Sequence, residues 1–586
     1  MSIFLKVWRL MWQYHDQMKQ LLRLKPLFAT NGMILEKSQK ESKVHSIFLF
    51  AEQTAEAQEY PSSSSKHSYS EQEPEDQHDK YSTRQKIGLF LGPLLFLLTL
   101  LFPTLEGLTN EGQSVAAVAL WMATWWITEA VPIPLTSLLP ILLFPATGAV
   151  SSKAATAPYA NDLIYLYLGG FLLAIAIEQW NLHRRIALHV IKMFGKNLDG
   201  LVLGFMVATG FLSMWISNTA TSMMMLPIGL AVIYQIADLF KEKQININTE
   251  QGKFPLGTAL MLGIAYSASI GGVATIIGTP PNTVLVAFIN ETYDKQISFG
   301  QWMVFGVPIA VVSLLFTWWY LTKIAFKTQI KSLPGGIEVI NNEIRKLGRM
   351  SKQEKQVLVI FSLTAFLWII RTFAIDWFKS IDIHTFDKIN DTTIAMFAAI
   401  LLFVIPVSLK NNQFLLSIDA FKKVPWGILL LFGGGLSLAD AMADTGLAEW
   451  IALKLQALEN VPALVLMLAV TTLVIFLTEM TSNTATATMM MPVMAALAMA
   501  MHAHPYGFLI TAAVAASFAF MLPVATPPNA IVFGTGYITI PQMAKAGFWL
   551  NIFGVLLITL LAYYYIPVVW NFDPNVLPDW AVFQPK

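Results

Sequence analysis

The chain has no cysteine and few charged residues, and each absence excludes a class of protein. Without cysteine, a chain of 586 residues has no disulfide, no thiol nucleophile and no cysteine-bound metal. Charged residues make up only 13% of the sequence and hydrophobic residues 55%, a balance too apolar for a soluble globular protein. Because Lys and Arg number 38 while Asp and Glu number 37, the net charge of +1 predicts no nucleic-acid partner.

Several functional motifs are absent as well. The nine histidines are scattered and form no His-Glu-x-x-His pattern, which argues against a zinc hydrolase. The N-terminus has no compact apolar segment before a cleavage site, so we expect no signal peptide. The apolar segments contain neither the paired acids or histidine clusters of an intramembrane enzyme nor the rings of charge that line a channel. The sequence therefore predicts a protein that is not an enzyme.

What the chain has instead is a series of apolar runs of about twenty residues. Examples are IGLFLGPLLFLLTLLF at 87–102, FPLGTALMLGIAYSASIGGVATIIG at 254–278 and FGVLLITLLAYYYIPVV at 553–569. A hydrocarbon core about 30 Å thick is crossed by about 20 helical residues. We therefore predict an all-α polytopic membrane protein with roughly eleven spanning helices.

The basic residues of the loops indicate how the chain is oriented. When the chain is threaded from a cytoplasmic N-terminus, most Lys and Arg residues of the loops fall on the inner side. Leaving aside Arg371 at a span end and the terminal Lys586, the outer loops carry only Lys153, Lys295, Lys379, Lys388 and Lys454. This bias predicts a multi-pass plasma-membrane protein, which in a bacterium means the cell inner membrane, with its N-terminus in the cytoplasm.

The composition divides the chain into five parts. Residues 1–86 differ from the rest, and their polar stretch at 60–86 predicts a cytoplasmic extension that is partly disordered. Residues 3–27 mix apolar and basic residues at helical spacing, which fits a membrane-surface helix and a loose tail equally well. The other parts are two apolar halves at 87–328 and 356–570, a cytoplasmic amphipathic linker at 329–355 and a C-terminal tail at 571–586.

The two apolar halves carry the same motifs in the same order. Ser-Asn-Thr-Ala-Thr occurs at 217–221 and at 482–486, a separation of 482 − 217 = 265 residues. A helix with adjacent glycines precedes each copy, and Thr-Pro-Pro-Asn follows at 279–282 and 526–529. Each half is therefore predicted to be one copy of an internal repeat.

Each Ser-Asn-Thr-Ala-Thr copy lies at the tip of an apolar hairpin. Basic residues flank the first hairpin, 200–239, so it starts and ends inside, whereas acidic or neutral residues flank the second, 461–500. The halves are therefore predicted to be inverted repeats, the arrangement of many secondary transporters. Each arm is nearly long enough to span the membrane, so length leaves both a full and a re-entrant hairpin open, and the polar tips favour re-entry.

The Thr-Pro-Pro-Asn motif predicts a broken helix. Proline lacks a backbone N–H, and the residue before it, here Thr279 or Thr526, is driven toward an extended conformation. Carbonyl groups one turn back, at 275–278 and 522–525, are expected to be released. Such carbonyl oxygens are suitable ligands for Na+.

The Ser-Asn-Thr-Ala-Thr motif predicts a complementary anion site. Ser217 and Ser482 are expected to begin half-helices whose N-termini direct partial positive charge toward a carboxylate. No Lys or Arg falls within 200–239, 461–500 or 262–288, so a buried dianion has no fixed countercharge there. Sodium ions bound beside the anion supply that charge, which is a physical reason for coupled transport.

A structural interpretation stands beside each functional one. A single Ser-Asn-Thr copy is explained as well by hydroxyls bonded to neighbouring backbone, whereas two copies at one offset favour function. The Met runs at 223–225 and 489–491 are interpreted as packing residues, and the glycine pairs that begin at 169 and 433 as close helix contacts. For Glu129 and Glu479, which lie in apolar segments, we favour a structural role in orienting helices or hairpin tips.

The motifs together resemble one family. WWITEAVPIPLTSLLPILLFP at 125–145, both Ser-Asn-Thr-Ala-Thr copies and FMLPVATPPNAIVFGTG at 520–536 are similar to the divalent anion/sodium symporters, carriers of di- and tricarboxylates, over about 87–575. The resemblance implies an inverted-repeat transporter with eleven transmembrane helices, two re-entrant hairpins and broken helices. It also implies an elevator mechanism, in which a scaffold holds a homodimer while a transport domain moves.

The resemblance also assigns the binding residues. One Na+ is expected at Ser213, Ser217, Asn218 and the carbonyl of Gly278, and a pseudo-symmetric Na+ at Thr478, Thr481, Asn483 and the carbonyl of Ala525. Substrate carboxylates are expected at Ser217, Asn218, Thr219, Ser482, Asn483 and Thr484, over a floor of Thr279, Thr526 and Pro527.

From these features we expect a Na+-coupled symporter that imports C4-dicarboxylates such as succinate, malate and fumarate. At least two Na+ are expected to accompany each dianion. The alternatives on the same fold are a Na+-independent dicarboxylate exchanger and a symporter that prefers citrate or sulfate. The expected partners are the dicarboxylate, sodium ions, the lipid bilayer and a second copy of the chain.

Overall fold

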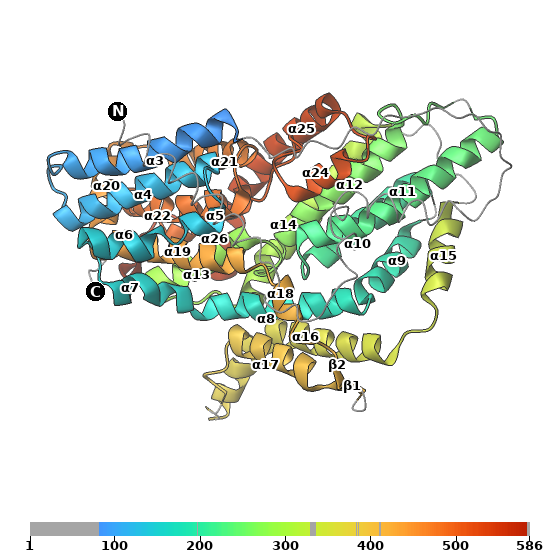
Figure 1. The fold of residues 1–586 in the computed structure, drawn as a ribbon, viewed down its shortest axis with the longest axis horizontal. Helices are drawn as coiled ribbons and strands as arrows, with labels where there is room; N and C mark the ends of the chain where they lie inside the picture. Colours follow the sequence, from blue (N-terminus) through green and yellow to red (C-terminus); the bar gives the residue numbers. More distant parts are fainter. Residues whose placement is uncertain are drawn as a thin grey trace, which may run out of the picture. The chain divides into compact units, whose positions relative to one another are not determined.

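The computed structural model describes residues 81–582, apart from 196, 246, 328–335, 383, 385 and 409–411. The N-terminal extension expected at 1–86 therefore lies outside the described residues as far as residue 80. The described chain is mostly helical (Figure 1). Its strands β1 (Pro406–Ser408) and β2 (Gln413–Phe414) form a two-stranded antiparallel hairpin.

The helices of the first half follow one another with short connections. They are α3 (Thr83–Leu101), α4 (Asn110–Thr128), α5 (Ile133–Thr136), α6 (Leu139–Thr147), α7 (Ser152–Thr156), η1 (Ala157–Ala160), α8 (Asp162–Gln179), α9 (Leu182–Phe194), α10 (Leu198–Ser213), α11 (Asn218–Glu242), α12 (Pro255–Gly272), α13 (Pro280–Tyr293), α14 (Phe299–Trp319) and the π-helical η2 (Tyr320–Ala325).

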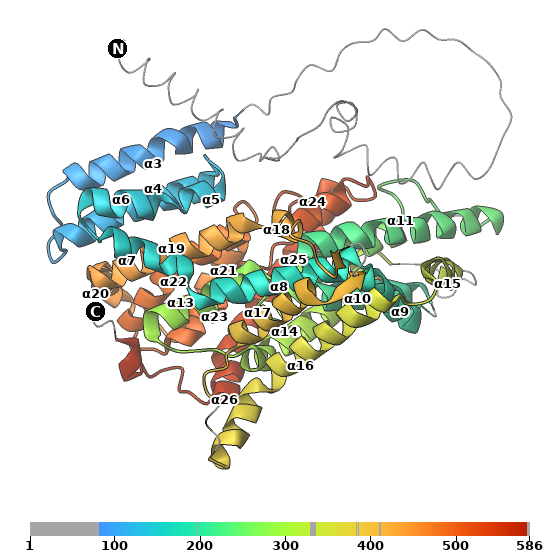
Figure 2. The ribbon, with the colours of Figure 1, turned by 60° about the horizontal axis from the view of Figure 1, so that its bottom comes forward.

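The second half begins with helices that pack beside α8 and α9. Its elements are α15 (Gly336–Leu347), α16 (Lys352–Ser380), α17 (Asp391–Val404), α18 (Ala420–Lys423), α19 (Trp426–Asp444), α20 (Leu447–Leu455), η3 (Gln456–Leu458), α21 (Ala463–Thr478), α22 (Asn483–Ala500), α23 (Pro505–Ala515), α24 (Pro527–Phe533), α25 (Ile540–Leu560), the π-helical η4 (Leu561–Tyr565), α26 (Ile566–Trp570) and η5 (Asp579–Ala581). Figure 2 shows α16 and α17 lying together below α8.

The second half repeats the element order of the first. A hairpin (α10 and α11), a helix pair with a break (α12 and α13) and a long helix with a π-helical end (α14 and η2) recur as α21 to η4. Upstream, α8 turns into α9 at Asn181 and α19 turns into α20 at Gly446, both with positive φ (56° and 72°). These two left-handed residues are 446 − 181 = 265 apart, the offset of the sequence motifs.

Seven helices of the described residues are long and apolar enough to cross a membrane, or up to eight if one bent pair counts as a single span. The bent pair is 447–458 with 463–478, whose axes meet at 114°. Four shorter apolar helices accompany them, at Ile133–Thr147, Leu198–Ser213, Asp391–Val404 and Pro505–Ala515. A polytopic membrane protein is therefore confirmed, while the count of eleven spans stays a prediction.

The two halves interlock through their hairpins and broken helices. α11 of the first hairpin packs against α24, which follows the second break, and α13, which follows the first break, packs against α22 of the second hairpin. Most of these helices contribute to one large cluster of buried apolar side chains. A smaller cluster of buried apolar side chains joins α4 and α6 to α19. Figure 1 shows these three helices side by side. The interlocking places both motif pairs within a common packed core.

The adjacent glycines allow close helix contacts, as interpreted from the sequence. A Cβ on Gly169 of α8 would lie 2.8 Å from the backbone of Ala395 on α17, and one on Gly434 of α19 would lie 2.3 Å from the carbonyl oxygen of Ser137. Real Cβ atoms do not approach so closely, so a larger residue would separate these elements. Of the Met runs, Met225 and Met491 are buried, whereas Met223 is mostly exposed.

Candidate functional site

Short polar loops connect the two arms of each hairpin. α10 ends at Ser213 and α11 begins at Asn218, with Ser217 as the N-cap whose hydroxyl accepts a hydrogen bond from the N–H of Ala220 (3.2 Å). In the second hairpin, Ser482 occupies the N-cap position of α22 but makes no capping bond with its side chain. Both tips thus begin a helix at the Ser-Asn bond, as the sequence predicts; α11 has 25 residues and α22 has 18.

Both Thr-Pro-Pro-Asn motifs begin a new half-helix after a break. Thr279 is extended (φ −142°, ψ 140°) and so is Thr526 (φ −141°, ψ 149°), while the following prolines occupy the first turns of α13 and α24. Proline suits that position because its missing N–H has no partner in the first turn of a helix anyway. The predicted extended residues before proline are therefore confirmed.

An oxygen cluster lies beneath each hairpin tip. Ser213 Oγ lies 2.5 Å from Asn218 Oδ1 and 2.7 Å from the carbonyl oxygen of Ala268. Thr478 Oγ1, at the equivalent position, lies 2.7 Å from Asn483 Oδ1 and 3.0 Å from the carbonyl oxygen of Ala516. A hydroxyl donates one proton only, so each cluster of three oxygens has more lone pairs than protons. Such a surplus of oxygen lone pairs favours a cation.

In the first repeat, a further oxygen converges on the same cluster. A Cβ on Gly272 would lie 2.7 Å from Asn218 Oδ1 and 3.0 Å from the carbonyl oxygen of Gly278. The two oxygens are therefore at most 2.7 + 3.0 = 5.7 Å apart across the space that the glycine leaves. Two oxygens that share an ion with ligand distances of about 2.3–2.6 Å, the range of Ca2+, a cation of similar size to Na+, lie at most about 5.2 Å apart, and the upper limit found here is close to that value.

The second repeat has a different residue at the corresponding place. The broken helices align at an offset of 529 − 282 = 247, so Ala519 replaces Gly272 and brings a methyl group. Thr481 lies within hydrogen-bond distance of Thr486 Oγ1 (2.7 Å) and of the carbonyl oxygen of Leu477 (2.9 Å). The second cluster therefore differs from the first by a methyl group in the broken segment and by a neighbouring Thr481 whose hydroxyl is hydrogen-bonded.

The asparagine of each Thr-Pro-Pro-Asn motif binds part of the broken backbone. Asn282 Nδ2 donates to the carbonyl oxygens of Gly272, Val273 and Thr275 at 3.2, 3.2 and 2.7 Å. Asn529 Nδ2 donates to those of Ala519 and Leu522 at 3.1 and 3.0 Å. In addition, the Thr283 hydroxyl donates to the carbonyl oxygen of Ile276 (2.7 Å). The expectation that all carbonyls at 275–278 and 522–525 are released is thus corrected at Thr275, Ile276 and Leu522. The Thr-Pro-Pro-Asn motif in the sequence predicts where each helix breaks. It does not show that the asparagine of the same motif hydrogen-bonds to the carbonyl groups of the broken segment.

The residues expected to meet the substrate differ in exposure. Ser217 and Pro527 are exposed, the floor residues Thr279 and Thr526 are buried, and the others are half-buried, namely Asn218, Thr219, Ser482, Asn483 and Thr484. Since α11 packs against α24 and α13 against α22, the expected residues of the two repeats belong to adjoining elements. Polar side chains of this exposure are accessible to a ligand without being fully solvated.

Some residues near the motifs make contacts that the sequence alone does not predict. Arg84 of α3 donates from Nη1 to the carbonyl oxygen of Met480 in the second hairpin loop (2.7 Å), 396 residues away in the chain. Glu129 lies in an apolar segment of the sequence, but its side chain is 40% exposed at the end of α4, and its carboxylate lies 3.7 Å from Arg84. An ion pair this exposed contributes little to stability.

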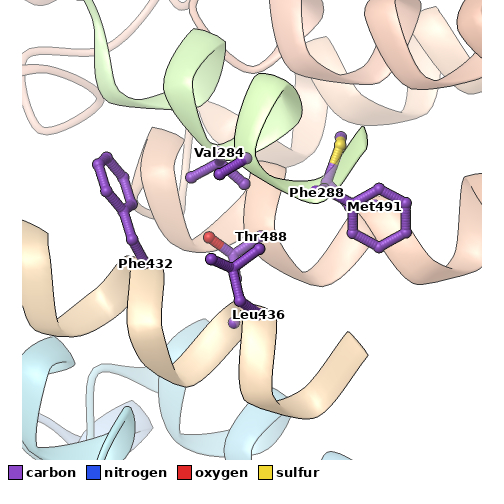
Figure 3. Close-up of a pocket in the computed structure, with 8 residues that line it drawn as sticks. Val284, Phe288, Phe432, Leu436, Thr488 and Met491 are labelled. Atoms are coloured by element: carbon purple, nitrogen blue, oxygen red, sulfur yellow. The ribbon is translucent and has the colours of Figure 1, made fainter. Parts of the chain in front are cut away.

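An apolar pocket lies one to two turns beyond the motifs. It lies between α13, α19 and α22 (Figure 3), and its lining includes Val284, Phe288, Phe432, Leu436, Thr488 and Met491. The hydroxyl of Thr488 already donates to the carbonyl oxygen of Thr484 (2.8 Å). This pocket therefore offers an anion no polar partner and is distinct from the oxygen clusters.

Two interlocked repeats of membrane helices, each with a polar hairpin tip and a broken helix, have the architecture of a membrane transporter. The fold is similar to that of the Alcanivorax borkumensis YdaH transporter, with a TM-score of 0.51 and 13% identity over 84% of this chain and 100% of that one. The sequence profile described as "Sodium:sulfate symporter transmembrane region" matches residues 84–571. The chain belongs to this family of divalent anion/sodium symporters and is a transporter, not an enzyme.

Relatives of high identity cover most of the chain. The sodium-dependent dicarboxylate transporter SdcS of Staphylococcus saprophyticus is 47% identical over 500 residues, which is 85% of this chain and 94% of the relative. The SdcS proteins of two Staphylococcus aureus strains are 46% and 45% identical over 497 residues, 84% of this chain and 94% of each relative. The similarity therefore extends over the whole described transporter core.

Proposed function

We propose that the protein is a sodium-coupled symporter that imports C4-dicarboxylates such as succinate, malate and fumarate. The observation that carries the proposal is the pair of oxygen clusters, at Ser213 and Asn218 and at Thr478 and Asn483, each with more oxygen lone pairs than protons. Each cluster adjoins the N-terminus of a half-helix. Relatives at 45–47% identity are named sodium-dependent dicarboxylate transporters, which supports the same cation and substrate class.

The sodium ions of this proposal lie in the two clusters. The first binds Ser213, Ser217, Asn218 and the Gly278 carbonyl. The second binds Thr478, Thr481, Asn483 and the Ala525 carbonyl. Because residues 200–239 and 461–500 contain no Lys or Arg, at least two Na+ are needed beside a dianion to reduce the cost of burying its charge.

The dicarboxylate binds between the two tips. One carboxylate binds Ser217, Asn218 and Thr219 and the other binds Ser482, Asn483 and Thr484, at two half-helix N-termini that direct positive partial charge toward it. The extended Thr279 and Thr526, with Pro527, form the floor. Sodium and dianion thus share Asn218 and Asn483, so that each stabilises the binding of the other.

We further propose that transport proceeds by an elevator motion in a homodimer. In this proposal the repeats are inverted and both hairpins are re-entrant, although α11, with 25 residues, is itself long enough to span the membrane. The lengths of α10 and α21 favour re-entry. Sixteen helical residues extend only about 24 Å, less than a hydrocarbon core of about 30 Å. The hairpins and broken helices form the transport domain, and this domain moves relative to the scaffold, which the remaining helices form.

Succinate uptake into proteoliposomes tests the proposal. A sodium gradient directed inward is expected to drive accumulation, and replacing Na+ by choline is expected to abolish it. Undiminished counterflow in choline would instead identify a sodium-independent exchanger and overturn the coupling. Competition by citrate or sulfate stronger than that by unlabelled succinate would overturn the substrate assignment.

A further inference from the structure

Glu479 is a buried carboxylate with four hydrogen-bond donors around it. It is the C-cap of α21, directly before the second hairpin loop, and its side chain is almost completely buried. Oε1 accepts from the N–H groups of Phe520 (2.7 Å) and Met521 (2.9 Å) and from Asn551 Nδ2 (2.7 Å). Oε2 accepts from the N–H of Leu522 (3.1 Å). Four N–H donors bound to two oxygens stabilise the carboxylate form of the group.

The three N–H groups belong to the break in the second repeat. The segment 516–526 connects α23 to α24 and includes Ala525, whose carbonyl we assign to the second sodium ion. Three successive N–H groups that point to one side have no partners in an adjacent strand or helix. Without Glu479, the three N–H groups would form a concave site for an anion. The carboxylate of Glu479 occupies that site.

In the first repeat, the corresponding backbone N–H groups have different hydrogen-bond partners. The residue equivalent to Glu479 is Met214, because 479 − 265 = 214. The N–H groups of Val273 and Ala274 bond to the carbonyls of Ile270 and Gly271, so the backbone there satisfies its own donors. Thr275 donates its hydroxyl proton to the carbonyl oxygen of Met214 (2.5 Å). The two breaks therefore share a sequence motif but differ in what fixes them.

We propose that Glu479 is a positioning residue of the second sodium site, which fixes the Ala525 carbonyl by binding the three N–H groups before it. This role rests on the proposed sodium coupling. It means that the two sodium sites are held in place by different interactions. The first site is set by local backbone turns and by the space at Gly272. The second is set by a carboxylate that joins the hairpin loop, the broken segment and α25 through Asn551.

The consequence is a sodium affinity that depends on one side chain outside the ligand shell. Replacing the carboxylate with a neutral amide, as in Glu479→Gln, removes the charge and leaves a single acceptor oxygen. The NH2 group then faces at least one of the three backbone N–H donors, so the segment 520–522 is held less firmly. We expect the sodium concentration for half-maximal succinate uptake to rise by about tenfold, the effect of losing a hydrogen-bond network to a charged group. The maximal rate at saturating sodium is expected to fall much less.

Unfolding temperatures of the purified full-length protein give a second measurement that needs no transport. Sodium without substrate stabilises a protein that binds it, so the unfolding temperature of the wild type is expected to rise with NaCl but not with choline chloride. Glu479→Gln is expected to need about tenfold more sodium for the same rise. Glu449→Gln removes an exposed acid from α20 in the same repeat and is the matched control.

A charge-transposed variant separates positioning from simple electrostatic attraction. Glu479→Gln combined with Asn551→Asp restores the negative charge at the same hydrogen-bonded pair but leaves the three N–H groups facing an amide. We expect it to retain the weakened sodium response. Full recovery would show that the nearby charge alone sets the affinity and would overturn the positioning role, as would an unchanged sodium response of Glu479→Gln.

The two proposals fail in different ways. If the protein does not couple to sodium, the wild type itself shows no difference between NaCl and choline chloride in either measurement. If it couples to sodium without a role for Glu479, the wild type responds and Glu479→Gln responds at the same concentrations.

Discussion

At the scale of single residues, Gly272 determines whether two oxygens can share an ion. A Cβ at this position would lie 2.7 Å from Asn218 Oδ1, so Gly272→Ala fills the space between that oxygen and the Gly278 carbonyl. We expect the sodium concentration for half-maximal uptake to rise by at least about tenfold. Gly507→Ala, where the new methyl group meets its nearest atom at 3.4 Å, is the control and should leave uptake unchanged. Equal sodium dependence of both variants would contradict the first cation site.

The two asparagines of the hairpin tips are expected to be essential for sodium-driven uptake. Asn218 and Asn483 each share their amide oxygen with a hydroxyl of the preceding helix and, in our proposal, with both sodium and substrate. Asn218→Ala and Asn483→Ala are each expected to reduce sodium-driven succinate uptake by more than about tenfold. Their unfolding temperatures without ligand should stay close to that of the wild type, because both side chains are half-buried. Normal uptake by either variant would refute the shared site.

Residues whose roles depend on their own neighbours in the chain could be predicted. Thr279 and Thr526 are extended because proline follows, and Ser217 caps a helix because its hydroxyl reaches an N–H three residues on. Glu479 could not be assigned, since its donors lie 41 to 72 residues further along the chain. Nothing in a linear pattern specifies which distant backbone groups a buried acid will meet.

At the scale of elements, the sequence predicts the breaks better than the spans. Two Thr-Pro-Pro-Asn motifs locate both broken helices, because a missing N–H acts locally. The number of membrane crossings is not fixed in the same way, because α20 with η3 and α21 form one apolar stretch that bends by 114°. The left-handed turns at Asn181 and Gly446 lie 265 residues apart, the offset of the sequence motifs, and glycine and asparagine are the residue types that adopt this conformation most readily.

His504, the N-cap residue of α23, is expected to make the stability of the protein depend on pH. His504 lies in the loop between α22 and α23, where its Nδ1 accepts from the N–H of Tyr506 (3.3 Å) and its ring stacks on Phe572 (4.1 Å between centroids). Burial lowers the pKa of His504 to about 4. The unfolded chain binds the proton more tightly, with a pKa near 6.5, so the stability that neutral His504 contributes falls as pH drops from about 6.5 toward 4.

His504→Asn tests this sign. Asparagine also caps helices but does not titrate, so the variant should lose less thermal stability than the wild type between pH 7.5 and 5.0. Unfolding temperatures of the detergent-solubilised protein at both pH values measure the difference. The same loss in both proteins would show that His504 does not contribute to acid sensitivity, since carboxylates elsewhere are common to the pair.

At the scale of the whole molecule, one hydrogen bond joins α3 to the second hairpin. Arg84 donates to the carbonyl oxygen of Met480, whose side chain is 64% exposed and which lies between Glu479 and the Ser-Asn-Thr-Ala-Thr copy. If the hairpins move against α3 and α4 during transport, this bond exists in only one of the alternating states. It then stabilises that state relative to the other, and transport requires that it break in every cycle.

A cross-link across this bond tests the motion, and the chain suits the experiment because it contains no cysteine. Arg84→Cys combined with Met480→Cys, joined by a short bifunctional thiol reagent, is expected to lose most sodium-driven succinate uptake because α3 and the hairpin can no longer separate. A reagent that a reductant cleaves should restore uptake. Each single cysteine variant, treated in the same way, controls for modification at one site. Full uptake by the cross-linked protein would mean that the hairpin and α3 stay together throughout the cycle, which an elevator that moves the hairpin past α3 does not permit.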